Sequence, residues 1–223
     1  RRAYSRTSRK RRMKRADPIV LSAPSGTGKT TLAHRLIEES DNCVFSLSIT
    51  TRTPRQGEQH GLDYFFVDGD RFDQMIESGD LAEWAYVHGG RYGTPKKALN
   101  DAADLGQHVV LDIDVQGALQ IRDAIPDAKL IFVLPPSVDV LLERLRIRGT
   151  EESEVLGLRL RSALEELEVA LDFDYIIINE HLSDCVQEIR DIIEGKETVG
   201  LNSEAIESIE VCRAGITSIL ERD

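Results

Sequence analysis

The chain is poor in cysteine. Its 223 residues include three cysteines, Cys43, Cys185 and Cys212, which lie far apart in the sequence. Cysteine-based metal sites and redox motifs need short, fixed spacings, and disulfide-stabilised secreted domains are rich in cysteine. The pattern excludes both classes and favours a reducing compartment, so we expect a cytoplasmic protein.

Aromatic residues and long apolar runs are also scarce. Phe, Trp and Tyr make up 5% of the chain, too few for aromatic stacking to be the main means of binding nucleic acid. No apolar run approaches the roughly 18 residues of a membrane-spanning helix, and we expect no membrane partner. Hydrophobic residues nevertheless reach 41%, enough for a core. The length favours one domain with a lid or an insert.

Acidic residues are absent from the first 15 positions, which hold nine Arg or Lys residues. The composition of residues 1–16 predicts a basic, disordered tail. Three interpretations of the tail stay open: a functionally neutral tail with Met13 as a natural start, an organellar transit peptide, and a polynucleotide-binding arm. Once these nine residues are set aside, the rest of the chain has 19 basic and 39 acidic residues, a net charge of −20. That charge repels nucleic acid outside local basic pockets.

A glycine-rich turn follows the first apolar segment, residues 18–22. It reads Ala23-Pro24-Ser25-Gly26-Thr27-Gly28-Lys29-Thr30, and the amphipathic segment after it predicts a helix to about Glu39. A strand, a glycine-rich turn and a helix that starts with Lys-Thr are typical of a P-loop, whose backbone N–H groups bind phosphates. Lys29 would reach the β- and γ-phosphates, and the Thr30 hydroxyl would ligate Mg²⁺. Ala23 stands where P-loops usually have glycine, at the opening of the turn.

Apolar segments alternate with amphipathic ones along most of the chain. We expect further strands at 43–48, 64–67, 82–87, 109–112, 129–134 and 175–178. We expect further helices at 68–78, 95–105, 116–124, 138–146 and 156–171, with Thr94 able to cap the helix over 95–105. Such alternation indicates an α/β fold in which helices cover both faces of a parallel sheet.

A polar segment between residues 48 and 61 carries two arginines three positions apart, Arg52 and Arg55. Their planar guanidinium groups are suited to clamping one phosphate between them. Tyr64 and Tyr92 offer hydroxyl groups to the same phosphate. From residue type alone, the alternative of two solvated surface charges stays open.

The same segment carries a longer motif, Ser-x-Thr-Thr-Arg-x-x-Arg-x-Gly-Glu-x-x-Gly-x-x-Tyr, over residues 48–64. It resembles the GMP-binding segment of guanylate kinases. Further matches follow in family order, at Leu81–Ala85, Arg91–Thr94, Leu111–Gly117, Pro135–Ser137, Arg148–Thr150 and Ile178–Asn179. The resemblance covers roughly residues 17–195. It implies the reaction ATP + GMP → ADP + GDP, with ATP as phosphoryl donor and Mg²⁺ as cofactor.

The resemblance also implies a P-loop nucleoside monophosphate kinase fold. Residues 17–47 and 95–196 would form the P-loop core domain, with a short lid at about 144–159. Residues 48–94 would form a small mixed α+β GMP-binding domain. Residues 197–223 exceed the family core and fit an amphipathic helical extension, which either packs on the body or forms an oligomer contact. The oligomeric state stays open.

The resemblance implies that the carboxylate of Glu83 recognises guanine. Guanine presents N1–H and N2–H₂ donors side by side next to the O6 acceptor, so one carboxylate can accept from both donors. Ser48 and Thr94 have hydroxyls that can donate to O6. Adenine lacks the N1 donor, and its mispairing with Glu83 in a closed site would cost several orders of magnitude in rate.

The resemblance also implies that cationic residues carry out phosphoryl transfer. The implied catalytic residues are Lys29, Arg55, Arg148 and Arg159. The implied ATP-binding residues are those of the P-loop, 23–30, together with Thr31, Arg144 and Asn179. The arginines of the lid would neutralise charge on the transferring phosphoryl group after closure expels water. For Asn179, a loop or cap amide stays the alternative.

Two acids follow an apolar strand, Asp112 and Asp114. The resemblance implies that they serve the metal and phosphates or the guanine edge, without dividing those roles between them. With Thr30, Asp112 would bind Mg²⁺. The alternative is that these acids cap the helix that follows. Two rival functions also stay open: a kinase for another nucleoside monophosphate, and a non-catalytic protein-interaction module with the same fold.

Overall fold

The computed structural model describes residues 16–87, 89–147, 153–196 and 203–221. Its strands are β1 (Ile19–Ser22), β2 (Cys43–Phe45), β3 (Ile49–Thr50), β4 (Phe65–Phe66), β5 (Leu81–Val87), β6 (Gly90–Pro95), β7 (His108–Asp112), β8 (Lys129–Leu134) and β9 (Tyr175–Ile178). Its α-helices are α1 (Lys29–Glu38), α2 (Gly69–Glu77), α3 (Lys96–Leu105), α4 (Val115–Ala124), α5 (Val138–Ile147), α6 (Ser153–Val169), α7 (Leu182–Glu194) and α8 (Ser203–Leu220).

The main sheet has five parallel strands in the order β2-β7-β1-β8-β9. Successive side chains of the central strand β1 enter opposite layers of the core, because side chains alternate along a strand. Ile19 and Leu21 pack in the layer covered by α1 and α7, and Val20 packs in the layer that includes α3, α4, α6 and α8. This two-sided burial explains why the strands read as continuous apolar runs, and it confirms the predicted α/β class.

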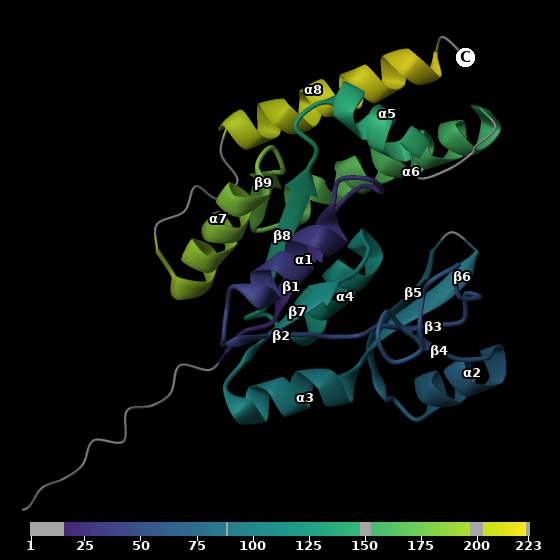
Figure 1. The fold of residues 1–223 in the computed structure, drawn as a ribbon, viewed down its shortest axis with the longest axis vertical. Coiled ribbons are helices and arrows are strands. Elements are labelled where there is room, and N and C mark those ends of the chain that lie inside the picture. The colour runs from purple at the N-terminus through teal and green to yellow at the C-terminus, as the bar shows by residue number, and fades with distance from the viewer. Residues whose placement is uncertain (1–15, 88, 148–152, 197–202, 222–223) are drawn as a thin grey trace, which may run out of the picture.

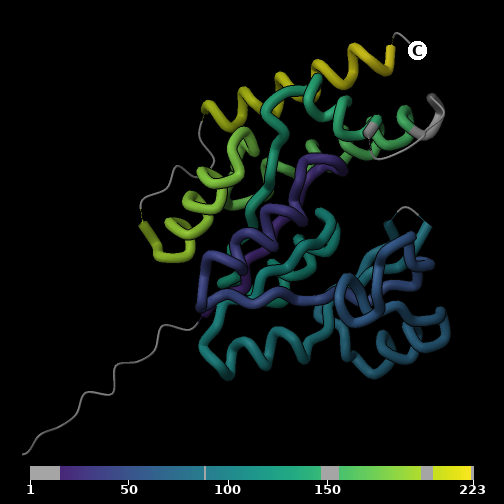
Figure 2. Tube along the Cα trace, in the orientation of Figure 1, coloured from purple at the N-terminus to yellow at the C-terminus, as the bar shows by residue number. Residues whose placement is uncertain are grey.

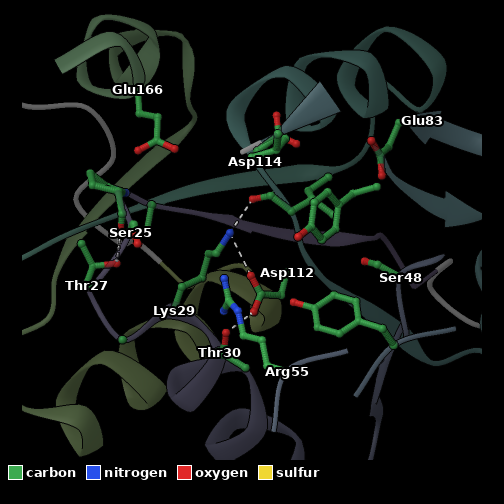
Figure 3. A pocket seen from close by; sticks show the side chains of 18 residues that line it. Ser25, Thr27, Lys29, Thr30, Ser48, Arg55, Glu83, Asp112, Asp114 and Glu166 are labelled. Atoms are coloured by element: carbon green, nitrogen blue, oxygen red, sulfur yellow. Dashed lines mark hydrogen bonds and ion pairs between the residues drawn. The ribbon is translucent and has the colours of Figure 1, made fainter. Parts of the chain in front are cut away.

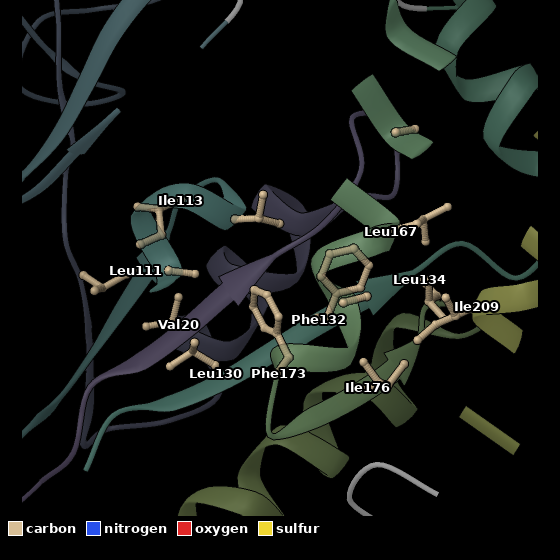
Figure 4. Close-up of a cluster of buried hydrophobic side chains, with 14 of the residues drawn as sticks. Val20, Leu111, Ile113, Leu130, Phe132, Leu134, Leu167, Phe173, Ile176 and Ile209 are labelled. Carbon is tan, nitrogen blue, oxygen red and sulfur yellow. The ribbon is translucent and has the colours of Figure 1, made fainter. Parts of the chain in front are cut away.

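The larger core layer is centred on β8 and the end of α6. Phe132 and Phe173 meet edge to face, with ring centroids 5.3 Å apart. Figure 4 shows these rings among the aliphatic side chains of β1, β7 and β9, with Ile209 of α8 at the far side. This core layer holds the strands of the main sheet rigidly. Ligands of α/β sheets bind at the C-terminal ends of the strands.

A second, smaller sheet has the order β4-β3-β6-β5 and mixes parallel with antiparallel pairs. It is inserted between β2 and α3, and with α2 it lies to one side of the main sheet (Figure 1). Its core is small: Ile49, Phe72, Met75 and Leu81. The order and mixed pairing agree with the small α+β unit expected over residues 48–94.

Strand β6 corrects one expectation. Thr94 was predicted to cap the helix over 95–105, but it lies within β6, and Pro95 occupies the N-cap position of α3 without a side-chain hydrogen bond. Glycines at 90 and 93 and the proline at 95 weaken the strand signal of this segment. Pairing with β5, where Glu83 lies opposite Thr94, makes it a strand.

The C-terminal helix α8 packs on the body of the protein. It lies against α5 and α6 (Figures 1 and 2). Ile209, Cys212 and Ile216 are buried in this contact. Of the two possibilities left open by the sequence, packing on the body is the one observed. Helix α7 lies within the family core, and the sequence analysis did not identify it.

No α-helix in the part of the chain that the structure describes is long and apolar enough to cross a membrane. All three cysteines are free and buried. Burial raises the pKa of each thiol to about 11, so they stay protonated and unreactive near neutral pH.

Candidate active site

The predicted P-loop, residues 23–30, lies between the end of β1 and the start of α1. Gly26 and Gly28 have φ angles of 91° and 92°, in the left-handed region that side chains disfavour. Within the turn, Thr27 donates its amide to the Pro24 carbonyl at 3.2 Å and its hydroxyl to the same carbonyl at 2.9 Å. The turn is thus closed by its own hydrogen bonds, with the N-terminus of α1 directed at the site.

Lys29 and Thr30 reach the end of β7 from the first turn of α1. Lys29 Nζ lies 2.8 Å from Asp112 Oδ1 and donates to the carbonyl of Ile113 at 2.6 Å. Thr30 donates its hydroxyl to Asp112 Oδ2 at 2.6 Å. One carboxylate at the end of a strand therefore holds both polar residues that the P-loop motif presents.

Two predicted ATP-binding side chains brace the P-loop from the opposite side. Arg144 on α5 and Asn179 after β9 both donate to the carbonyl of Thr27, at 2.9 and 2.6 Å. Together with Gly26, Gly28 and Thr31, they line an open pocket beside the turn. The alternative for Asn179, an amide that supports a loop, is therefore met in this structure, and its contact with ATP stays a prediction.

Glu83 lies on β5, on the face that turns toward α4. It is 4% exposed, and Thr94 donates its hydroxyl to Glu83 Oε1 at 2.6 Å. Burial raises the pKa of this carboxyl to about 7; the hydrogen bond from Thr94 works against the rise, and the nearby Asp114 adds to it. Thr94 is fully buried behind Glu83 and does not line the cavity described next.

A cavity of about 210 Å³ connects the P-loop with the small sheet. Its lining includes many of the predicted site residues: the P-loop from Ala23 to Thr30, and Ser48, Arg55, Tyr64, Glu83, Tyr92, Asp112 and Asp114. Figure 3 shows Ser25 and Thr27 on one side, Ser48 and Glu83 on the other, and Lys29 with Asp112 between them. Residues predicted for two different substrates thus face a single space.

The two arginines of the polar loop have different surroundings. Arg55 lines the cavity. Arg52 makes a two-pronged contact with Glu58, at 2.8 and 2.9 Å, and donates to the Tyr92 hydroxyl at 2.9 Å. The Glu58 bond raises the pKa of Arg52 and lowers that of Glu58. Direct phosphate binding by Arg52 stays a prediction, because its guanidinium is engaged within the loop in this structure.

The acid that ends β7, Asp112, and the acid that follows the strand, Asp114, have different partners. Asp112 holds Lys29 and Thr30 as described above. Asp114 is the N-cap of α4 and accepts from the amides of Gln116 and Gly117, at 2.7 and 3.2 Å. The helix-cap alternative is therefore observed for Asp114, although its side chain also lines the cavity.

Sequence reasoning missed Glu166, which also lines the cavity (Figure 3). It is half-buried on α6, and within the described residues it makes no hydrogen bond or ion pair. The signal was present: Glu166 follows Arg159 by seven positions, which places both on one face of a helix. Arg159 lines a neighbouring cavity with Thr30, Thr31 and Arg55. Arg148 lies outside the described residues.

The donor set at the P-loop suits a hard cation that binds phosphates. The Thr30 hydroxyl and the Asp112 carboxylate are side by side and line the cavity shared with Arg55. Mg²⁺ is commonly bound through one or two protein oxygens, with waters and substrate phosphates completing its shell. The described residues contain no group of three or more His, Cys, Asp or Glu side chains that could hold a metal by themselves.

Comparison with known proteins identifies the family. A guanylate kinase family model matches residues 15–196. The guanylate kinase of Nitratidesulfovibrio vulgaris is 49% identical over 172 residues, which cover 77% of this chain and 83% of that protein. The guanylate kinase of Streptomyces kasugaensis is 46% identical over 170 residues, covering 76% and 83%. The crystal structure of guanylate kinase from Anaplasma phagocytophilum has a TM-score of 0.67 and 33% sequence identity, and covers 93% of this chain and 94% of its own. The chain therefore belongs to the guanylate kinase family.

Proposed function

We propose that this protein is a nucleoside monophosphate kinase that transfers the γ-phosphoryl group of ATP to GMP, giving ADP and GDP. One observation carries the proposal: a single cavity is lined at one end by a P-loop and at the other by Glu83 and Ser48. A nucleoside triphosphate bound at one end and a guanine nucleotide bound at the other would bring their phosphates together near Lys29. Membership of the guanylate kinase family supports the same reaction.

Acceptor selection depends on Glu83. Its carboxylate accepts from guanine N1–H and N2–H₂, while the Ser48 hydroxyl donates to O6. Thr94 positions Glu83: its hydroxyl donates to Glu83 Oε1 and holds that oxygen in place. Adenine at this position would leave a buried carboxylate facing an acceptor, which a closed site penalises strongly.

Transfer itself depends on position and charge. The attacking oxygen of the GMP phosphate is already anionic near neutral pH, so no strong general base is needed. The backbone N–H groups of the P-loop and Lys29 hold the phosphates of ATP, and Arg55 holds the phosphate of GMP with Tyr64 and Tyr92. Arg148 and Arg159 would neutralise the charge that develops during transfer when the lid segment closes.

Thr30 and Asp112 are the residues that would hold Mg²⁺, because they combine a hydroxyl with a carboxylate at the edge of the phosphate site. When bound, Mg²⁺ supplies positive charge to the β- and γ-phosphates. The protein itself orients Asp112. The Lys29 ammonium pairs with Asp112 Oδ1, the oxygen that does not contact Thr30.

The division into a core domain, a GMP-binding domain and a lid is part of this proposal. The two sheets meet where α4 faces β5, so closure of the small sheet over bound GMP would narrow the cavity between them. We also propose a cytoplasmic location, supported by three buried, free cysteines. Microscopy of the tagged full chain in its native cell would test the location.

The decisive test is a coupled assay of ATP-dependent phosphorylation with GMP, AMP, UMP and dTMP as acceptors. The proposal expects GMP to be preferred by at least about 10²-fold in kcat/KM. Preference for another acceptor would make the protein a different nucleoside monophosphate kinase. Binding of GMP without turnover of any acceptor, in the presence of ATP and Mg²⁺, would favour the interaction-module alternative.

A further inference from the structure

Glu83 is held between the two units of the fold. Its strand, β5, belongs to the small sheet. The helix that faces β5 is α4, which follows β7 of the main sheet. Gln120 of α4 fastens this contact: its amide donates to the Trp84 carbonyl at 2.8 Å and accepts from the Trp84 amide at 3.3 Å. The backbone next to Glu83 is therefore fixed to α4. These two hydrogen bonds resist any movement of β5 that would carry the Glu83 carboxylate away from α4.

The carboxylate of Glu83 rests directly on the first turn of α4, at Gly117. A Cβ atom added at Gly117 would lie 2.5 Å from Glu83 Oε2 and 3.0 Å from Glu83 Cδ. Real Cβ atoms essentially never approach another heavy atom closer than 3.0 Å. A methyl group at this position would therefore push the carboxylate back by at least about half an ångström, or force β5 away from α4.

The other side of the carboxylate offers no easy retreat. Oε1 is bonded to the buried hydroxyl of Thr94, and Glu83 is 4% exposed. Any shift of the carboxylate would stretch the Thr94 bond or turn the two oxygens out of the plane in which guanine presents its donors. A bidentate contact is sensitive to both changes, since its two hydrogen bonds need a shared plane.

We infer that Gly117 is a positioning residue for guanine selection: its missing side chain is the space in which the Glu83 carboxylate is seated against α4. The inference rests on the proposed function, in which Glu83 binds the guanine edge. Gly117 touches no substrate itself and acts through Glu83. Alanine has a higher helix propensity than glycine, yet the chain has glycine at this position of α4.

The test is Gly117→Ala in the full chain. We expect KM for GMP to rise roughly 10- to 100-fold, as for a misplacement of this size at a recognition group. KM for ATP should stay within about twofold, because the P-loop is untouched, and kcat should change less than KM for GMP. The preference for GMP over IMP should shrink, since IMP lacks the 2-amino group that the displaced carboxylate would no longer reach.

Another glycine gives a matched control. An added Cβ at Gly215, on α8, would lie 2.7 Å from Val138 Cγ2, which is a steric conflict away from the cavity. Gly215→Ala should lower the melting temperature without changing the GMP-over-IMP preference. Loss of that preference in Gly215→Ala would mean that any loosening of the fold has this effect, and would overturn the inference.

A double variant tests the contact directly. Glu83→Asp shortens the side chain by one methylene and vacates the space that the new methyl group needs. We expect Gly117→Ala to add little to the KM for GMP in a Glu83→Asp background, so that the two effects combine to much less than their product. Independent, multiplying effects would show that the methyl group acts elsewhere. If Gly117→Ala alone does not fold, restoration of folding by Glu83→Asp supports the contact, and failure to restore it overturns the inference.

Glu83→Gln separates this inference from the proposed function. If Glu83→Gln leaves the KM for GMP and the GMP-over-IMP preference unchanged, then Glu83 does not read guanine, and the proposed function fails at this residue. If Glu83→Gln has the expected effect and Gly117→Ala does not, the proposed function stands and only the role of Gly117 is wrong.

Discussion

Lys29 and Asp112 form an ion pair of 2.8 Å across the mouth of the P-loop, with side chains 18% and 11% exposed. The same ammonium donates to the Ile113 carbonyl, so two contacts fix Lys29 at the end of β7. The pair links the first turn of α1 to the end of β7. A cation held in advance in this way needs little reorganisation when phosphate arrives.

Lys29→Met should therefore abolish most turnover while the fold survives. We expect kcat to fall by roughly 10²- to 10³-fold, the loss typical of removing one preorganised charge from a transition state. The coupled assay measures the rate, and circular dichroism checks the fold. Lys97→Met is the control, since Lys97 is 81% exposed in a pair with Asp101. Near-native turnover of Lys29→Met would remove Lys29 from the catalytic residues.

The strands of the main sheet could be predicted because burial on both faces leaves an apolar run that needs no partner to be recognised. Val109, Val110 and Leu111 are an example, with exposures of 3%, 0% and 1%. Strand β6 could not be predicted in this way. Its glycines and proline give no local preference for a strand, and its conformation comes from pairing with β5, a contact that the sequence does not spell out.

The site shows the same division. The P-loop was predictable because its chemistry is contiguous in the sequence, from Ala23 to Thr30. The engagement of Arg52 by Glu58 and Tyr92 was not, because an arginine in a polar loop fits a phosphate clamp and an internal ion pair equally well. Glu166 was missed because a glutamate among other glutamates on an amphipathic helix is usually a solvated charge.

Acceptor binding should depend on pH through Glu83. Burial raises the pKa of this carboxyl to about 7, and only the ionised form accepts from both guanine donors. We expect KM for GMP to fall as pH rises from 6 to 8, with little change in KM for ATP. The groups that face Glu83 and act on its ionisation are Thr94, Asp114 and Lys29. Initial rates over a pH series at saturating ATP measure the effect.

Glu83→Gln is the control for that pH series, because GMP phosphate also titrates near pH 6. The variant keeps the shape of the side chain but cannot ionise. Its KM for GMP should be raised at every pH, and the part of the pH dependence that belongs to Glu83 should vanish. An unchanged profile in the variant would assign the pH dependence to the substrate.

Arg55 and Arg52 should respond differently to substitution. Arg55 lines the cavity, and Arg55→Ala should lower kcat/KM for GMP by roughly 10- to 100-fold, as expected for a lost charge-assisted hydrogen bond. Arg52→Lys should behave like Arg52→Ala, because an ammonium cannot reproduce the two-pronged bond to Glu58. Arg71→Ala, on the exposed face of α2, serves as the control. If Arg52→Lys keeps native kinetics, charge alone is what this position needs.

The last prediction concerns Glu166 and the stability of the fold. Burial raises the pKa of Glu166 from 4.5 to about 7; Asp114 and Glu165 add to the rise, and Lys29 opposes it. A carboxyl with a raised folded-state pKa holds its proton more tightly in the folded protein than in the unfolded one. Its contribution to stability is therefore complete below about pH 4.5 and is lost as pH rises through about 7.

Glu166→Gln removes the charge that the wild type must bury above pH 7. We expect the variant to have the higher free energy of unfolding at pH 8, by on the order of 1–3 kcal/mol, and the difference to shrink toward pH 5. Urea denaturation at pH 5, 6, 7 and 8 measures it. A gain for Glu166→Gln that is equal at all four pH values would mean that packing of the amide, and not loss of a buried charge, stabilises the variant.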